Sequence, residues 1–120
     1  MNTFSWLILA HLLADWLLQN DWMAQGKRGG LITAAGLVHF AIYTVTVLSF
    51  LGVAVNGSLN AGQYLLWALV IFISHWLIDA TDLVRRWMRF YGQRDQAMVR
   101  LMIDQTLHLL ILGGIALFLS

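Results

Sequence analysis

Four long apolar segments dominate the pattern of hydrophobic and polar positions along this chain. A helix that spans a bilayer needs roughly 20 mostly apolar residues, with about 17 as the lower limit. The segments that reach this length lie at about residues 3–19, 31–55, 62–83 and 101–119. The sequence therefore predicts an all-α integral membrane protein, a four-helix bundle that forms a single transmembrane domain over residues 1–120.

The connections between these segments differ in charge, and the difference predicts an orientation. The second connection, residues 56–61, is short and uncharged, and it is rich in residues that favour turns. All seven Lys and Arg residues fall in the first and third connections, at Lys27, Arg28, Arg85, Arg86, Arg89, Arg94 and Arg100. The positive-inside rule puts these two connections in the cytoplasm and both termini on the opposite side of the membrane. We therefore expect a multi-pass protein of the inner membrane.

Composition supports a lipid environment and excludes several kinds of chemistry. Hydrophobic residues make up 60% of the chain and charged residues 11%, which is far from the balance of a soluble domain. The chain has no cysteine, which excludes disulfides, thiolate metal sites and cysteine nucleophiles. No Lys or Arg precedes the first apolar run, so we expect that run to be kept as a helix rather than cleaved as a signal peptide. The basic third connection contains no recognisable nucleic-acid-binding module, and we expect no nucleic-acid partner.

Seven ionisable side chains interrupt the apolar segments. Such a residue at mid-bilayer costs about 2.5 to 3.5 kcal/mol on insertion scales, and it usually has a function. All four histidines of the chain are in this set, which comprises His11, Asp15, His39, His75, Asp79, Asp104 and His108.

The spacing of these residues predicts that they converge. Three His/Asp pairs are four residues apart, one in each of the first, third and fourth segments, and this spacing puts both members on one helix face. Counted from the cytoplasmic end of each helix, the four histidines lie about 12 Å deep and the three aspartates about 6 Å deep. The order is reversed in the fourth segment, Asp104 before His108, as the opposite direction of that helix requires. We therefore predict a layer of four histidines with three aspartates on its cytoplasmic side.

This set of side chains favours a bound divalent metal, with zinc first and iron or manganese as alternatives. Neutral imidazole and carboxylate are ordinary ligands for these ions, and a divalent cation would offset the cost of three buried negative charges. All seven residues are candidate ligands, and Asp15, Asp79 and Asp104 are also candidate catalytic groups because they lie nearer the cytoplasmic entrance. Catalytic sites typically use three protein ligands, so seven candidates imply either two metals or aspartates that act as outer partners and general base. The alternative is a hydrogen-bonded network that only holds the helices together.

Three polar residues near the first connection are weaker candidates. Gln19 continues the four-residue series after His11 and Asp15, so it is a candidate substrate contact at the rim of the site. A rim glutamine is also often just solvated. Asp21 and Lys27 are positioned to meet a lipid head group or one another.

The motifs together resemble a family of small bacterial membrane proteins known as domain of unknown function 3307. The resemblance covers nearly the whole chain and is carried by His11-x-x-x-Asp15-x-x-x-Gln19, Asp21-Trp22-Met23-Ala24 with Lys27, His39, His75-x-x-x-Asp79 and Asp104-Gln105-x-x-His108. It implies no particular activity. A looser likeness, based on residue type alone, is to metal-dependent inner-membrane hydrolases that carry scattered His and Asp in short hydrophobic chains.

The sequence thus favours a metal-dependent membrane hydrolase whose site opens to the cytoplasmic leaflet and acts on a lipid or lipid-linked substrate. A proton or metal-ion transporter is the first alternative, because buried His and Asp also form relays. Few polar residues occupy the outer halves of the segments, which argues against a continuous path, although Thr44, Thr46 and Ser49 weaken that argument. The second alternative is a structural or regulatory subunit. A homo-oligomer is compatible with each of these functions.

Overall fold

The computed structural model describes residues 1–120, and it contains helices and loops but no strand. The elements in order are α1 (Thr3–Leu12), η1 (Leu13–Leu17), α2 (Asp21–Gly26), α3 (Ala34–Ala54), α4 (Ala61–Ala80), α5 (Leu83–Tyr91) and α6 (Ala97–Phe118). The element η1 is one turn of π-helix that continues α1. The prediction of an all-α protein is confirmed.

Polar side chains mark where the helices begin. Asn2, Asn20, Thr33 and Asn60 each accept a hydrogen bond from a backbone N–H three residues later. These bonds satisfy amide groups that the first turn of a helix leaves without a partner. At α4 the Gln63 side chain also accepts from the Asn60 backbone N–H at 2.9 Å, which completes a capping box.

Three helices are long and apolar enough to cross a membrane, namely α3, α4 and α6. They indicate a membrane protein, and they overlap the second, third and fourth predicted segments, although α6 begins four residues earlier than predicted. The first segment is shorter than expected, because α1 has ten residues and η1 five, and the helix ends at Leu17. Its helical part is about 22 Å long, less than a typical spanning helix.

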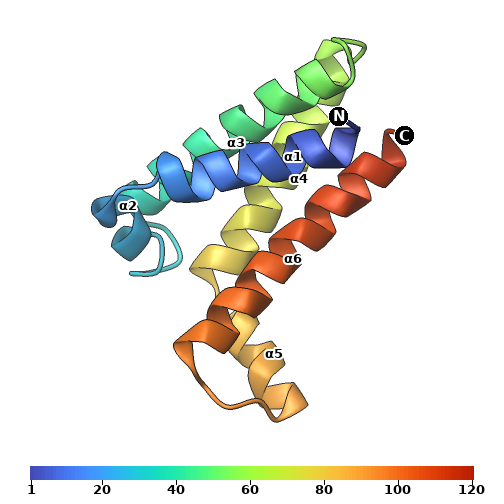
Figure 1. Cartoon of the computed structure of the whole chain (residues 1–120). Helices are drawn as coiled ribbons and strands as arrows, with labels where there is room; N and C mark the ends of the chain where they lie inside the picture. The colour runs from blue at the N-terminus through green and yellow to red at the C-terminus, as the bar shows by residue number, and fades with distance from the viewer.

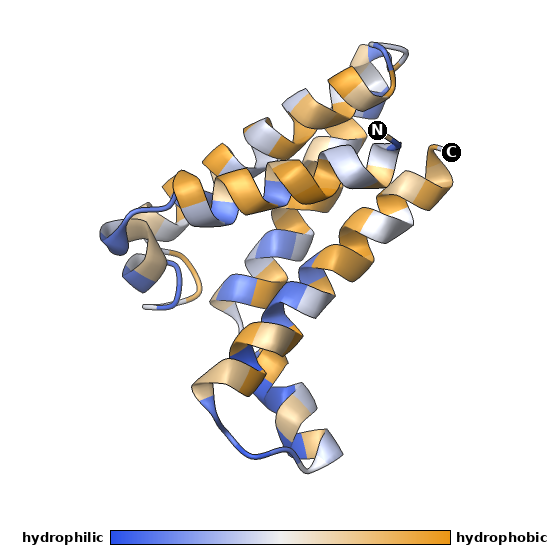
Figure 2. Ribbon diagram, in the orientation of Figure 1, coloured by the Kyte–Doolittle hydropathy of each residue, from blue (hydrophilic) through white to orange (hydrophobic).

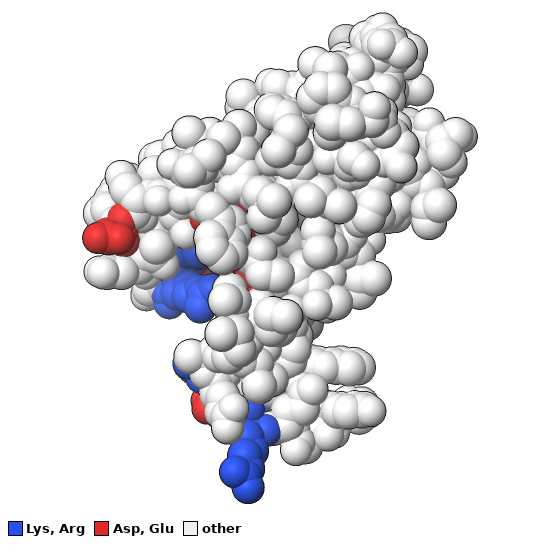
Figure 3. Space-filling view, viewed as in Figure 1, with Lys and Arg blue, Asp and Glu red and all other residues white.

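The segment α1–η1 and the three long helices form a closed cycle of contacts. In this cycle α1 packs on α3, α3 on α4, α4 on α6 and α6 on α1. Both termini lie together at one end, and α2 and α5 lie at the other (Figure 1). Hydropathy follows the same axis, since the hydrophilic positions of the long helices gather toward the α2 and α5 end (Figure 2). On the face shown in Figure 3, the Lys, Arg and Asp atoms likewise lie toward that end, and none is seen on the part of the surface nearest the termini.

The half of the molecule nearer the termini has an apolar core. It is made by eleven buried residues, Leu7, Ala10, Ala14, Tyr43, Val47, Leu51, Trp67, Ile71, Leu112, Ile115 and Ala116. Large apolar side chains also face outward from the long helices, among them Val45, Leu65 and Leu110, each with more than 60% of its surface exposed. Exposed apolar surface on all three long helices is what lipid contact requires.

The two short helices, α2 and α5, lie in segments that the hydrophobic pattern predicts as connections. Each is shorter than ten residues, so neither reaches the length that predicts a spanning helix. Helix α5 buries Val84 and Met88, which form a second small core with Ile78 of α4. Its last residue, Tyr91, is followed by the C-cap Gly92, whose φ of 76° suits a residue without a Cβ.

Candidate metal centre

Six of the seven predicted residues come together in two groups of possible metal ligands. The first group is Asp15, His39, His75 and Asp79, and the second is Asp79, Asp104 and His108. Within each group one ligand atom from every residue lies within 4.8 Å of the others, and all of these residues are buried. Asp79 belongs to both groups, so its carboxylate stands between two candidate sites.

The first group has the spacing of a tetrahedral metal site. The two imidazole Nε2 atoms of His39 and His75 are 2.9 Å apart. Asp15 Oδ1 lies 3.2 and 3.5 Å from these two nitrogens, and Asp79 Oδ2 lies 3.6 and 3.2 Å from them. Four donors at 2.0–2.1 Å from a zinc ion at tetrahedral angles would be about 3.3 Å apart. The observed separations bracket that value, so the residues present fit such an ion.

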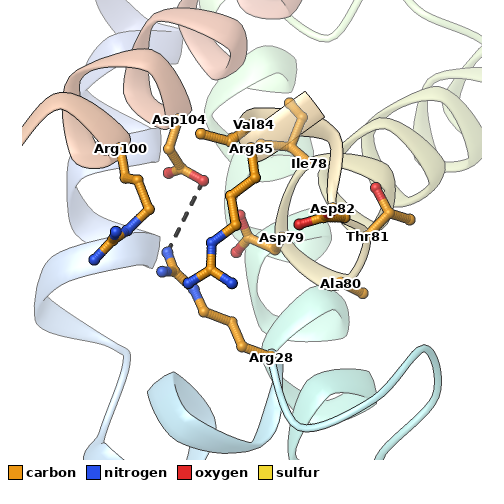
Figure 4. A pocket seen from close by; sticks show the side chains of 10 residues that line it. All are labelled: Arg28, Ile78, Asp79, Ala80, Thr81, Asp82, Val84, Arg85, Arg100 and Asp104. Atoms are coloured by element: carbon orange, nitrogen blue, oxygen red, sulfur yellow. Dashed lines mark ion pairs between the residues drawn. The ribbon is translucent and has the colours of Figure 1, made fainter. Parts of the chain in front are cut away.

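The second group has three residues and opens to a cavity. The His108 ring donates from Nδ1 to the Asp104 carbonyl oxygen at 2.8 Å, because a carbonyl can only accept. This bond leaves the lone pair of His108 on Nε2, which lies 3.4 Å from Asp79 Oδ1. Asp79 and Asp104 also line a cavity of about 320 Å³ (Figure 4). The group therefore has three protein donors beside a space that water or substrate can enter.

Several of the converging atoms have no hydrogen-bond partner. Asp15 Oδ1, Asp79 Oδ1 and His108 Nε2 are buried, and no donor or acceptor bonds to them. The Nδ1 atoms of His39 and His75 are also without a partner, so the polar contacts of these two rings lie inside the group. A buried polar group without a partner costs about 1–3 kcal/mol, and such groups call for an explanation such as a bound ion.

His11 is not in either group, because both of its ring nitrogens are already bonded. Its Nε2 donates to Gln105 Oε1 at 2.8 Å, and its Nδ1 accepts from the Tyr43 hydroxyl at 3.0 Å. Gln105 then donates from Nε2 to Asp104 Oδ2 at 3.0 Å, which fixes the orientation of its amide. A hydrogen-bonded chain thus runs from Tyr43 through His11 and Gln105 to the carboxylate of Asp104. In this arrangement His11 orients a donor of the second group instead of joining it.

Lys27 is the residue beside the donor groups whose location differs most from the one that the sequence predicts. We expected it near the membrane surface, in contact with a lipid head group or Asp21, but it is buried, and its Nζ lies 2.6 Å from Asp79 Oδ2. The preceding residue makes this possible, because a Cβ added at Gly26 would lie 2.2 Å from the Cβ of Ala35. Only glycine lets the end of α2 approach the start of α3 so closely. The Thr33 hydroxyl, which donates to the Gly26 carbonyl at 2.6 Å, strengthens that contact.

Gln19 does not continue the predicted four-residue series. The Leu18 N–H bonds to the Leu13 carbonyl, five residues back, and the helix ends one residue earlier, at Leu17. The Gln19 side chain donates to the carbonyl oxygen of Asp15 at 3.2 Å, so it supports the end of the helix that carries Asp15. Gln19 does not line the cavity beside the second group. Single π-turns of this kind are frequent at functional sites.

Comparison with known proteins bears on the family but not on the activity. The family model described as "Protein of unknown function (DUF3307)" matches residues 3–119. The chain belongs to this family. The resemblance inferred from the sequence motifs is therefore confirmed. No curated protein and no solved structure matches this DUF3307 member.

Proposed function

We propose that the chain is a metal-dependent membrane hydrolase with a two-ion centre. The observation that supports this most strongly is the shared carboxylate of Asp79. It joins a four-donor group with tetrahedral spacing to a three-donor group that borders a cavity. A four-donor site is typical of an ion held in place, whereas three protein ligands with one open position are typical of a catalytic ion.

The balance of buried charge supports a divalent cation. Asp15, Asp79 and Asp104 are buried carboxylates, and Lys27 is the only Lys or Arg buried with them. With neutral histidines the cluster then carries a formal charge of −2, which one divalent ion cancels. A second ion would leave an excess of positive charge for an anionic substrate and hydroxide. Two imidazoles and two carboxylates at tetrahedral spacing favour zinc, with iron and manganese as alternatives.

The three aspartates have different roles in the proposed hydrolysis. A metal ion bound at the second group would lower the pKa of a bound water and so supply the nucleophile. Asp104 is the carboxylate best placed to accept a proton, because it lines the cavity and is held by Gln105. Asp79 belongs to both groups, and Asp15, which does not line the cavity, completes the first group. In this proposal the three aspartates suggested by the sequence have different tasks: Asp104 accepts a proton, and Asp79 and Asp15 serve as metal ligands.

The orientation proposed from charge belongs to the same hypothesis. The segment α1–η1 crosses as a fourth, short helix, which a locally thinned bilayer can accommodate. The basic connections then face the cytoplasm of a bacterial inner membrane, and the termini face the opposite side. The site consequently opens to the cytoplasmic leaflet, where a lipid or lipid-linked substrate can reach it.

Two observations favour a hydrolase over its rivals. A transporter needs a polar path through the outer half, but that half is filled by the eleven-residue apolar core. The hydroxyls of Thr44, Thr46 and Ser49 do not form such a path, because each donates to a carbonyl four residues back in its own helix. A purely structural network would satisfy its own polar atoms, whereas several atoms of this cluster have no partner.

Metal analysis of the purified protein tests the proposal directly. We expect two transition-metal ions per chain in the native protein and at most one in the double variant His39→Ala/His75→Ala, which removes two donors of the first group. The control is the double variant Thr44→Ala/Ser74→Ala, which changes two polar residues on the same two helices, α3 and α4, outside both groups and should retain both ions. The native protein without stoichiometric metal would reject the proposal, and ion flux in reconstituted vesicles would favour the transporter.

A further inference from the structure

The cavity beside the second donor group has a basic rim. Three arginines from different parts of the chain line it, namely Arg28 after α2, Arg85 in α5 and Arg100 in α6. Figure 4 shows their side chains around the same space as the carboxylates of Asp79 and Asp104. The positive-inside rule explains why arginines would lie on the cytoplasmic side of the membrane, but it does not explain why three of them surround one cavity.

The guanidinium groups of these arginines are largely free to bind a ligand. Arg85 has no carboxylate partner within 4.0 Å, and the only ion pair of Arg28 is with Asp104 at 4.0 Å. Arg100 pairs with Asp95, whose side chain is 61% exposed, and an exposed ion pair contributes little stability. The remaining acid of the lining, Asp82, is bound to Arg89 at 3.0 Å.

Three guanidinium groups around one space are suited to an anion with several oxygens. The planar fork of arginine donates two parallel hydrogen bonds to a phosphate or carboxylate, so three forks match a group with three terminal oxygens. The carboxylates of Asp79 and Asp104 on the inner wall would weaken the binding of such an anion, and cations at the donor groups would offset that repulsion. This electrostatic effect links the cavity to the metal centre proposed above.

We propose that the cavity binds the phosphate monoester end of a lipid. Arg28, Arg85 and Arg100 hold the terminal oxygens, and the phosphorus faces the second donor group. Ile78 and Val84 add apolar lining close to the end of α4. The orientation proposed above puts this level at the membrane surface, which suits the head of a lipid. The assignment of substrate rests on the proposed function, whereas the binding of phosphate is a separate property of the arginines.

The reaction implied is hydrolysis of the ester. Water adds to phosphorus and the bond between phosphorus and the lipid oxygen breaks. The lipid alcohol leaves with one proton of the water, and inorganic phosphate keeps the remaining hydroxyl. No oxidant, reductant or further reactant is needed.

Binding of short-chain lipids to the purified full-length protein tests this proposal. The probes are dihexanoyl phosphatidic acid, a monoester; dihexanoyl phosphatidylglycerol, an anionic diester; and inorganic phosphate, each titrated by calorimetry in a neutral detergent. We expect phosphatidic acid to bind most tightly. Arg28→Gln, Arg85→Gln and Arg100→Gln should each weaken it about tenfold or more, as loss of a charge-assisted hydrogen bond predicts.

Arg86→Gln is the matched control, because it makes the same charge change on the same helix at a residue that does not line the cavity. It should change the affinity less than twofold. Equal weakening by Arg85→Gln and Arg86→Gln, or equal affinity for the two lipids, would mean nonspecific attraction and overturn the proposal. Inorganic phosphate binding as tightly as phosphatidic acid would overturn the assignment to a lipid.

Metal content separates this proposal from the proposed function. If the protein holds its metal ions but the three arginine variants bind phosphatidic acid normally, only the phosphate site is wrong. If the native protein contains no metal but still binds phosphatidic acid through these arginines, the hydrolase is wrong and the phosphate site stands.

Discussion

The two halves of this molecule are built from the same helices but bury opposite kinds of side chain. Toward the termini, the core is apolar and the hydroxyls on α3 are bonded to their own helix. Toward α2 and α5, the same helices bury seven ionisable groups and Lys27, and several of their polar atoms have no partner. This contrast between a half that satisfies its polar groups and a half that leaves several unpaired supports the proposal of a ligand in the second half.

The largest expected effect comes from removing the residue that joins the two donor groups. Asp79→Ala should abolish binding at both metal sites and leave the buried ammonium of Lys27 without its partner. Breaking a buried ion pair on one side costs about 3–5 kcal/mol, so the free energy of unfolding should fall by that amount. Metal analysis and denaturant unfolding in detergent measure the two losses.

The control for this change is Asp82→Ala, three residues further along the chain. Its side chain is 47% exposed and its partner Arg89 is also exposed, so stability should change by no more than about 0.5 kcal/mol. The double variant Asp79→Ala/Lys27→Met should recover stability without recovering metal. Full metal content in Asp79→Ala would show that the carboxylate is not shared by two ions.

A smaller and purely structural effect is expected in the apolar half. Leu51 is fully buried, so Leu51→Ala should lower the free energy of unfolding by about 2–4 kcal/mol through the cavity it leaves. Because the apolar core does not supply metal ligands, the metal content should stay at the native value. Leu65→Ala is the comparison, since that side chain is 64% exposed on the outside of α4 and should be nearly neutral. Loss of metal in Leu51→Ala would mean that the halves are not independent.

The comparison also explains how much of the fold could be predicted from the sequence. The sequence predicts the three long helices because a helix that crosses a bilayer needs a long unbroken run of apolar residues. It does not predict helix α5, because these nine residues are rich in arginine and contain no such run. Val84 and Met88, which are four residues apart, are nevertheless the two residues of its buried face. The π-turn at Leu13–Leu17 was also missed, since nothing in the hydrophobic pattern distinguishes it from α-helix.

The candidate site was predictable where local spacing controls it and not where tertiary contacts do. Residues four apart on a helix share a face, and this spacing correctly predicts that Asp79 lies beside His75. The same spacing from His39 leads to Tyr43, whose ring stacks on that of His75 with 3.7 Å between the ring centroids. The burial of Lys27 was not predictable in this way. It depends on the close approach of Gly26 to Ala35, between two helices whose packing the sequence does not record.

The smallest expected effect concerns the hydrogen-bonded chain at the boundary between the halves. Tyr43→Phe removes the hydroxyl that donates to His11 Nδ1 and keeps the ring that packs in the core. The free energy of unfolding should fall by about 0.5–1.5 kcal/mol, the usual net contribution of one hydrogen bond. Metal content should not change, because Tyr43 is not in either donor group.

Tyr64→Phe is the matched control for this last prediction, since it removes the same atom at a tyrosine on α4 that lies outside both donor groups and the apolar core. It should leave both stability and metal content unchanged. A loss of metal in Tyr43→Phe alone would show that the chain through His11 and Gln105 holds Asp104 in its binding position. The boundary between the halves would then lie one helical turn further from the cavity, with Tyr43 on the side of the site.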